Sequence, residues 1–197
     1  MSKDWIGNAE SAFKQLGASN HCSDDREEND FYATDPRAIT DLVYRENFSK
    51  DIWECAVGQG HLAQRLKEYG FNVKCSDIVD RGYPNTEIVD FLKTTIKFNG
   101  DIVTNPPYKY CAEFILKALE SVENGQKVAM FLKLQTLEGS KRYEEIYSKY
   151  PPKTIYVYVK RIQCAKNGEF KGSSAVCYAW FVWQKGFKGD TVLKWIN

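Results

Sequence analysis

The stretch Asp101-Ile102-Val103-Thr104-Asn105-Pro106-Pro107-Tyr108 decides how the rest of the chain can be arranged. Its first residues form a short apolar run, and because prolines are excluded from central strands, we expect a strand that stops at Asn105. Pro106 and Pro107 restrict their own φ angles and keep the preceding residues extended. The sequence thus predicts a rigid turn at the carboxyl end of a strand, where open α/β sheets place their ligands.

The residues of this turn suit a planar group that carries an amine. The Asn105 side-chain oxygen and the Pro106 carbonyl can accept hydrogen bonds, the prolines donate none, and Tyr108 offers a flat face for stacking. Two acceptors on one NH2 group would make its nitrogen more nucleophilic. We therefore take Asn105, Pro106, Pro107 and Tyr108 as candidate catalytic residues. The alternative interpretation is a plain proline turn after a strand.

A second motif lies upstream, where a strand expected over 51–56 leads into Val57-Gly58-Gln59-Gly60 and then a helical pattern. Glycines in such a turn let the backbone approach a ligand closely. Glu54 precedes the glycines, and Asp77 ends the next apolar run about 20 residues after Gly58, the distance at which a carboxylate binds ribose hydroxyls in dinucleotide folds. Ile78 follows as a surface for an adenine ring. A third glycine is missing, so the dinucleotide motif itself is incomplete.

Acidic and amide side chains follow four expected strands. A third short strand over 87–91 carries Asp90, which taken singly would be a surface turn residue. Taken in series, Glu54, Asp77, Asp90 and Asn105 each end an apolar run. Since the carboxyl ends of parallel strands meet at one edge of a sheet, we expect these four side chains at the same edge.

The second half of the chain continues the alternation of helix and strand. Apolar residues at helical spacing predict a helix from Cys111 to Val122, and 127–132 reads as a buried strand. Two further strands are expected over 154–160 and 174–183, and the segment between them is too short for a helical crossover, so they should be antiparallel. The predicted fold is α/β: a mostly parallel sheet that finishes in an antiparallel hairpin.

Composition narrows the class of protein. The 197 residues carry a net charge of +1, so any contact with nucleic acid must come from a local patch. The six cysteines include no C-x-x-C pair, and we interpret them as reduced thiols of a cytoplasmic protein. With two histidines a zinc site is not expected, and we expect no metal. We find no signal peptide and no long apolar run in the sequence, so we predict no membrane association.

The best local basic patch lies between the last two expected strands. It consists of Lys160, Arg161, Lys166 and Lys171 around Phe170. Lysine and arginine on such a loop are typical of phosphate contacts, and Phe170 is a candidate for stacking on a base. A solvated loop without function is an equally good interpretation.

Taken together, the chain resembles small adenine-specific DNA methyltransferases of phages and prophages, which use S-adenosylmethionine. The resemblance rests on Asn105–Tyr108, on the Glu-x-x-x-Gly-x-Gly pattern of 54–60, and on 16–21, 26–36, 131–139 and 179–186. It implies a Rossmann-like methyltransferase fold. It also implies that Thr34 and Pro36, with Tyr32 beside them, contribute to the methionine end of the cofactor site, and that Asp90-Phe91 contacts the cofactor adenine. The full set of expected cofactor residues is Tyr32, Thr34, Pro36, Glu54, Gly58, Gly60, Asp77, Ile78, Asp90, Phe91 and Asn105.

The same resemblance sets the expected organisation and chemistry. Residues 1–30 form an N-terminal arm, and 31–197 form the catalytic domain without a separate target-recognition domain. The expected reaction transfers a methyl group to the N6 amine of a flipped DNA adenine. RNA adenine, a protein glutamine amide, or a non-catalytic cofactor-binding subunit are the alternatives. The sequence leaves open which DNA sequence is the target and whether a restriction partner exists. It also leaves open whether the protein forms a homodimer or uses a separate specificity partner.

Overall fold

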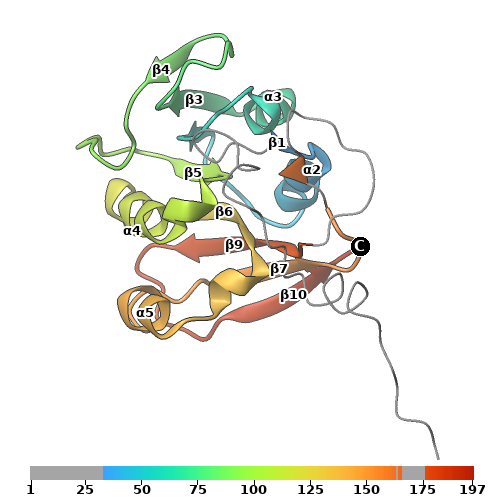
Figure 1. Ribbon diagram of the computed structural model, residues 1–197, viewed down its shortest axis with the longest axis vertical. Helices are drawn as coiled ribbons and strands as arrows, with labels where there is room; N and C mark the ends of the chain where they lie inside the picture. The colour runs from blue at the N-terminus through green and yellow to red at the C-terminus, as the bar shows by residue number, and fades with distance from the viewer. Residues whose placement is uncertain (1–32, 163, 166–175) are drawn as a thin grey trace, which may run out of the picture.

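The computed structural model describes residues 33–162, 164–165 and 176–197, which form one α/β unit (Figure 1). Its elements, in chain order, are β1 (Ala33–Thr34), α2 (Arg37–Val43), β2 (Asp51–Glu54), α3 (His61–Glu68), β3 (Asn72–Asp77), β4 (Thr86–Ile88), β5 (Asp101–Thr104), the 3-10 turn η3 (Tyr108–Tyr110), α4 (Cys111–Ser121), β6 (Lys127–Lys133), the 3-10 turn η4 (Leu134–Leu137), α5 (Ser140–Arg142), the π-helical turn η5 (Tyr143–Tyr147), β7 (Thr154–Tyr158), β8 (Cys164–Ala165), β9 (Tyr178–Gln184) and β10 (Val192–Ile196).

Eight strands form one sheet in the order β10-β7-β9-β6-β5-β2-β3-β4. All neighbours pair in parallel except β9, which is antiparallel to both β6 and β7. The predicted antiparallel pair is therefore present, and β9 lies between β6 and β7. Its first residue is Tyr178, later than the predicted start of that strand. The predicted fold class, a mostly parallel sheet with an antiparallel hairpin, is confirmed.

The edge strand β10 was not predicted from the sequence. Its side chains are exposed from Val192 to Trp195, and only Ile196 is buried. The strand pairs in parallel with β7, with Val192 opposite Thr154 and Ile196 opposite Tyr158. Backbone pairing rather than side-chain burial holds β10 in the sheet. Its sequence therefore shows no hydrophobic alternation from which a strand could be predicted.

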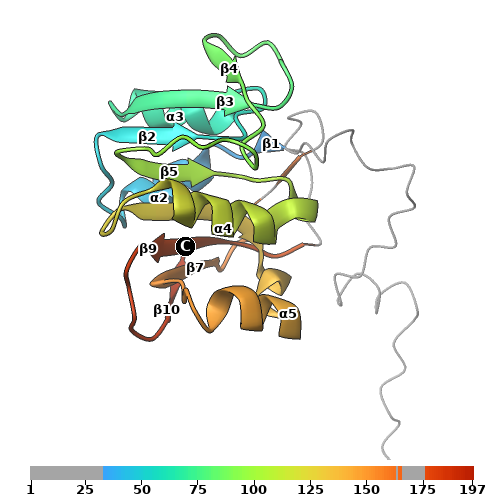
Figure 2. The same cartoon turned by 90° about the vertical axis from the view of Figure 1, so that its left-hand side faces the viewer.

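Helices cover both faces of the sheet, as Figure 2 shows with α4 in front of the strands and α2 and α3 behind them. Alternation along β5 and β6 separates the two layers: Ile102 and Met130 pack with α4 and η5, while Val103 and Ala129 pack with α2 and α3. Both clusters are made of fully buried apolar side chains, so the sheet forms the rigid centre of the protein.

Helix α2 begins at Arg37, directly after Pro36. The Asp35 carboxylate accepts the backbone N–H of Arg37 at 2.9 Å while pairing with the Arg37 guanidinium. Asp35 thus supplies the side-chain oxygen that the start of the helix needs.

A second, two-stranded sheet joins distant parts of the chain. Strand β1 pairs antiparallel with β8, with Ala33 opposite Ala165 and Thr34 opposite Cys164. This pairing holds the segment before α2 against the segment between β7 and β9. It places Thr34 beside the carboxyl end of β5, as its contacts in the next section show.

Candidate functional site

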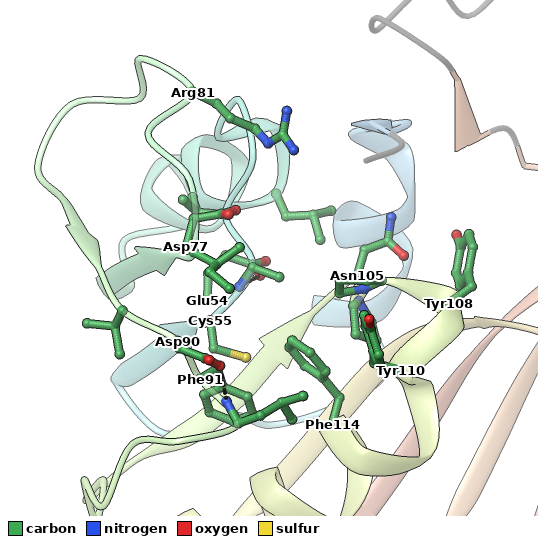
Figure 3. Close-up of a pocket in the computed structure, with 18 of the residues that line it drawn as sticks. Glu54, Cys55, Asp77, Arg81, Asp90, Phe91, Asn105, Tyr108, Tyr110 and Phe114 are labelled. Carbon is green, nitrogen blue, oxygen red and sulfur yellow. Dashed lines mark hydrogen bonds between the residues drawn. The ribbon is translucent and has the colours of Figure 1, made fainter. Parts of the chain in front are cut away.

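A pocket of about 390 Å³ opens at the carboxyl ends of β2, β3 and β5 (Figure 3). Its volume falls within the range of roughly 300–1,000 Å³ that is usual for small-molecule sites. The four side chains expected at one sheet edge all line it. The predicted residues in its wall are Thr34, Glu54, Asp77, Ile78, Asp90, Phe91, Asn105, Pro106, Pro107 and Tyr108.

The glycine turn is braced by Asp77. One carboxylate oxygen of Asp77 accepts the Gly58 backbone N–H at 2.8 Å, and the other accepts the Val79 N–H at 3.1 Å. Gly58 and Gly60 have φ angles of 55° and 85°, in the left-handed region that favours glycine. Neither glycine lines the pocket; they turn the chain from β2 into α3. Asp77 therefore shapes the turn, and its oxygens retain lone pairs for a ligand.

Gly60 is also packed tightly from the side. A Cβ atom at this position would lie 1.9 Å from the nearest ring carbon of Tyr83, which belongs to the connection between β3 and β4. The Tyr83 ring is covered in turn by the Lys67 ammonium, 4.9 Å from its centroid. The glycine thus allows the β3–β4 connection to pack directly on the turn between β2 and α3.

We expect Gly60→Ala to destabilise the protein by about 1–3 kcal/mol more than Gly82→Ala, as overpacking of a filled site does. Gly82 is a matched control because its φ of 82° is equally unfavourable for alanine, while no atom of the described residues beyond its chain neighbours lies within 4 Å of its Cβ position. Urea unfolding of both variants measures the difference. Equal losses of free energy of unfolding would show that Tyr83 yields without resistance.

Glu54 is a fully buried carboxylate at the end of β2. Its Oε1 accepts the Ala56 backbone N–H at 3.2 Å, whereas Oε2 has no hydrogen-bond partner among the residues that the structure describes. Burial raises the pKa of Glu54 from 4.5 to about 8; the Thr104 hydroxyl and the Ala56 N–H offset part of the rise, and the negative charge of Asp77 adds a little to it. A buried acceptor of this kind, in the wall of a pocket, is suited to a cationic or proton-donating ligand.

Asn105 is held by Thr34. The Asn105 Nδ2 group donates a hydrogen bond to the Thr34 hydroxyl at 2.8 Å, so the rotation of the amide is set by a residue 71 positions away. This bond uses the amide nitrogen and directs Oδ1 to the other side of the Cγ atom. Thr34, assigned by resemblance to the methionine end of a cofactor site, thus also contacts the turn that follows β5.

Tyr108 begins the η3 turn directly after the two prolines. Its ring centroid lies 5.7 Å from that of Tyr178 at an interplanar angle of 32°, and the Lys133 ammonium lies 4.8 Å from it. Figure 3 shows Tyr108 beyond Asn105, on the side of the pocket opposite Asp77. The pocket therefore extends from acidic side chains at one end to an aromatic ring at the other.

Asp90 and Phe91 lie in the wall of the pocket with different surroundings. Lys93 pairs with the Asp90 carboxylate at 2.9 Å, and this contact keeps the pKa of Asp90 below its ordinary value. Phe91 is 2% exposed and packs edge-on against Trp53 at 5.2 Å, so it is mainly a core residue. Ile78 is 54% exposed and presents apolar surface at the pocket.

Several residues of the pocket were not predicted. They include His61, Arg81, Lys93, Tyr110 and Phe114. His61 directly follows the glycine turn at the start of α3, so its place could have been inferred, and burial lowers its pKa. Arg81 comes from the β3–β4 connection, at the rim of the pocket in Figure 3, where no sequence pattern indicates a site.

Other predicted residues lie elsewhere. Pro36 precedes α2 and does not line the pocket. Lys160 and Arg161 are exposed just after β7. The N-terminal arm 1–30 and the predicted residues Tyr32, Lys166, Phe170 and Lys171 lie outside the described residues. Within the described ranges no cluster of three or more His, Cys, Asp or Glu could hold a metal ion, and no helix is long and apolar enough to cross a membrane.

No protein-family model and no curated protein sequence matches the chain. Solved structures do match. The methyltransferase subunit of a type I restriction-modification system from Streptococcus thermophilus superposes with a TM-score of 0.64 at 13% identity, over 86% of this chain and 48% of its own. A predicted O-methyltransferase from Agrobacterium tumefaciens gives 0.60 at 14% identity, over 82% and 85%. A Listeria monocytogenes protein assigned to the class I S-adenosylmethionine-dependent methyltransferases gives 0.57 at 12% identity, over 80% and 62%.

These identities are low, so the similarity concerns the fold. The protein has the Rossmann-like fold of the S-adenosylmethionine-dependent methyltransferases, as predicted. It spans about half the length of the restriction-modification subunit.

Proposed function

We propose that the protein is an S-adenosylmethionine-dependent methyltransferase that acts on the N6 amine of adenine in DNA. The observation that carries the proposal is the Asn105 amide, which Thr34 orients at the end of β5 and which lines the same pocket as Glu54 and Asp77. A methyltransferase subunit of a restriction-modification system among the structural neighbours supports DNA as the substrate.

The pocket fits the cofactor in size and in the chemistry of its wall. The cofactor ammonium would pair with Glu54, whose Oε2 is buried without a partner among the described residues. Asp77 retains acceptor positions for ribose hydroxyls, and Ile78 offers exposed apolar surface for the adenine ring. Asp90 would accept a hydrogen bond from the adenine amine while its carboxylate also pairs with Lys93. When bound, the cofactor supplies a methyl group that its sulfonium already activates.

The protein groups at the other end of the pocket bind and orient the target amine. Extruding adenine from a duplex costs a few kcal/mol. Asn105 Oδ1 and the Pro106 carbonyl accept the two amine hydrogens, and Tyr108 stacks on the base. Orientation of this kind is worth roughly 7–11 kcal/mol of the barrier. The two acceptors also stabilise the positive charge that develops on the nitrogen, which assigns Asn105 and Pro106 the principal catalytic role.

The remaining features of the proposal concern organisation. Residues 31–197 form the catalytic domain, preceded by the arm 1–30, and the segment from Lys160 to Lys171 contributes phosphate contacts. Target choice is assigned to a homodimer or to a separate specificity subunit.

We expect methyl transfer from labelled cofactor to DNA, and not to RNA or protein, when the protein is incubated with separate pools of each. Digestion of the DNA to nucleosides and mass spectrometry should identify N6-methyladenine. Asn105→Ala serves as the blank. Label in RNA or in a protein glutamine amide would replace the DNA assignment by one of the two alternatives. Cofactor binding without transfer to any pool would indicate a non-catalytic subunit.

A further inference from the structure

Two lysines lie over the two tyrosines of the η3 turn. The Lys133 ammonium is 4.8 Å from the centroid of the Tyr108 ring, and the Lys109 ammonium is 5.1 Å from that of Tyr110. Both tyrosines line the pocket, next to the prolines that follow β5. Neither lysine belongs to the basic segment 160–171.

The sheet places Lys133 at this point. Lys133 is the last residue of β6, which runs parallel to β5, and Met130 of β6 is paired with Thr104. The lysine therefore extends beyond the level of Asn105 at the same sheet edge. Its partner across β9 is Tyr178, whose ring also contacts Tyr108. Lys133 and Tyr178 thus form one platform beside the catalytic ring.

Lys133 and Lys127 lie on the same strand in different charge environments. Among the described residues no carboxylate lies within ion-pair distance of its ammonium, whereas Lys127 on the same strand pairs with Glu46 at 2.6 Å. A hydrogen bond between an ammonium and an anion is stronger than the contact of a half-exposed cation with an aromatic ring. An anion brought to Tyr108 would therefore attract the ammonium away from the ring.

We propose that Lys133 binds a backbone phosphate next to the target adenine, with Lys109 on the neighbouring ring contributing a second contact. The inference rests on the proposed function: a nucleotide whose base stacks on Tyr108 with its amine at Asn105 carries its phosphates beside that ring. A glutamine side chain would bring no such anion. Lys133 would thus select a nucleic-acid substrate at the catalytic turn itself, independently of the basic segment 160–171.

The test is the salt dependence of DNA binding in Lys133→Met, which keeps an unbranched side chain at this position and removes the charge. Each phosphate contact contributes about −0.9 to the slope of log affinity against log salt on duplex DNA, so the slope should flatten by about one unit. The KM for DNA should rise more than kcat falls. Lys133→Arg should restore the wild-type slope, and affinity for the cofactor should not change.

Lys194→Met is the matched control. Lys194 lies on β10, away from the pocket, and its ammonium is 5.6 Å from the centroid of the Tyr156 ring. It removes the same charge from a similar lysine-tyrosine pair and should leave the slope unchanged. An unaltered slope in Lys133→Met, or an equal flattening in both variants, would overturn the assignment of Lys133 while leaving the proposed function intact. A wild-type protein that transfers no methyl group to DNA would overturn both.

Discussion

Replacing Asn105 with alanine is expected to lower the rate of methyl transfer by at least about 100-fold, the loss seen when one preorganised hydrogen-bonding group is removed from a reacting centre. Alanine removes the Oδ1 acceptor and also the hydrogen bond from Asn105 Nδ2 to the Thr34 hydroxyl. Because the amine of the substrate makes this contact, affinity for the cofactor should change little. Single-turnover transfer to DNA and calorimetry with cofactor measure the two quantities separately.

Two further variants separate the acceptor from its support. Asn105→Asp keeps an acceptor oxygen, and the Thr34 hydroxyl can rotate to donate to it, so part of the activity should remain. Thr34→Val removes the partner of Asn105 Nδ2 but not Oδ1, and about a tenfold loss is expected from one hydrogen bond. An Asn105→Ala protein that keeps a tenth or more of the wild-type rate would contradict the catalytic assignment.

The second large effect concerns Glu54 and pH. Glu54→Gln should lower affinity for S-adenosylhomocysteine, the product that keeps the ammonium, by about 10- to 100-fold at pH 8, because a charge-assisted bond becomes a neutral one. In the wild-type protein the pKa of Glu54 is about 8, and pairing with an ammonium lowers it. Below pH 8 binding therefore releases a proton, and affinity should rise about tenfold per pH unit between pH 6 and 7.

Calorimetry in two buffers with different ionisation enthalpies counts the released protons. We expect close to one for the wild-type protein at pH 6.5 and none for Glu54→Gln, whose affinity should be flat over the same range. Proton release that is equal in both proteins would assign the titration to another group. It would also remove Glu54 from the ammonium site.

The stability of the Glu54→Gln protein without ligand is a control for folding. The pKa of Glu54 in the folded protein, about 8, lies above its ordinary value of 4.5. The folded state therefore binds the proton more tightly than the unfolded state, and the stability that the protonated group allows is lost as pH rises from 4.5 towards 8. Glu54→Gln avoids this loss, so at pH 8 it should unfold at a higher urea concentration than the wild-type protein.

Much of the fold and part of the candidate site could be predicted because their signals are local. The prolines after Thr104 end a strand wherever the chain goes next, and the glycines after Glu54 require a turn. Once strands and helices alternate, parallel pairing brings the carboxyl ends of the strands to one edge. That step alone collects Glu54, Asp77, Asp90 and Asn105 in one pocket without knowledge of any contact between them.

The contacts that give those residues their properties depend on the tertiary structure. Thr34 meets Asn105 across 71 positions of the chain, and the two-residue strand β1 that carries Thr34 leaves no pattern in a sequence. Lys133 reaches Tyr108 because β6 lies beside β5 in the sheet order. The raised pKa of Glu54 comes from layers of distant residues that exclude water. The sequence by itself determined which chemical groups stand at the sheet edge. Long-range packing alone decided how they are oriented, charged and supported, because those properties depend on neighbours that are remote along the chain.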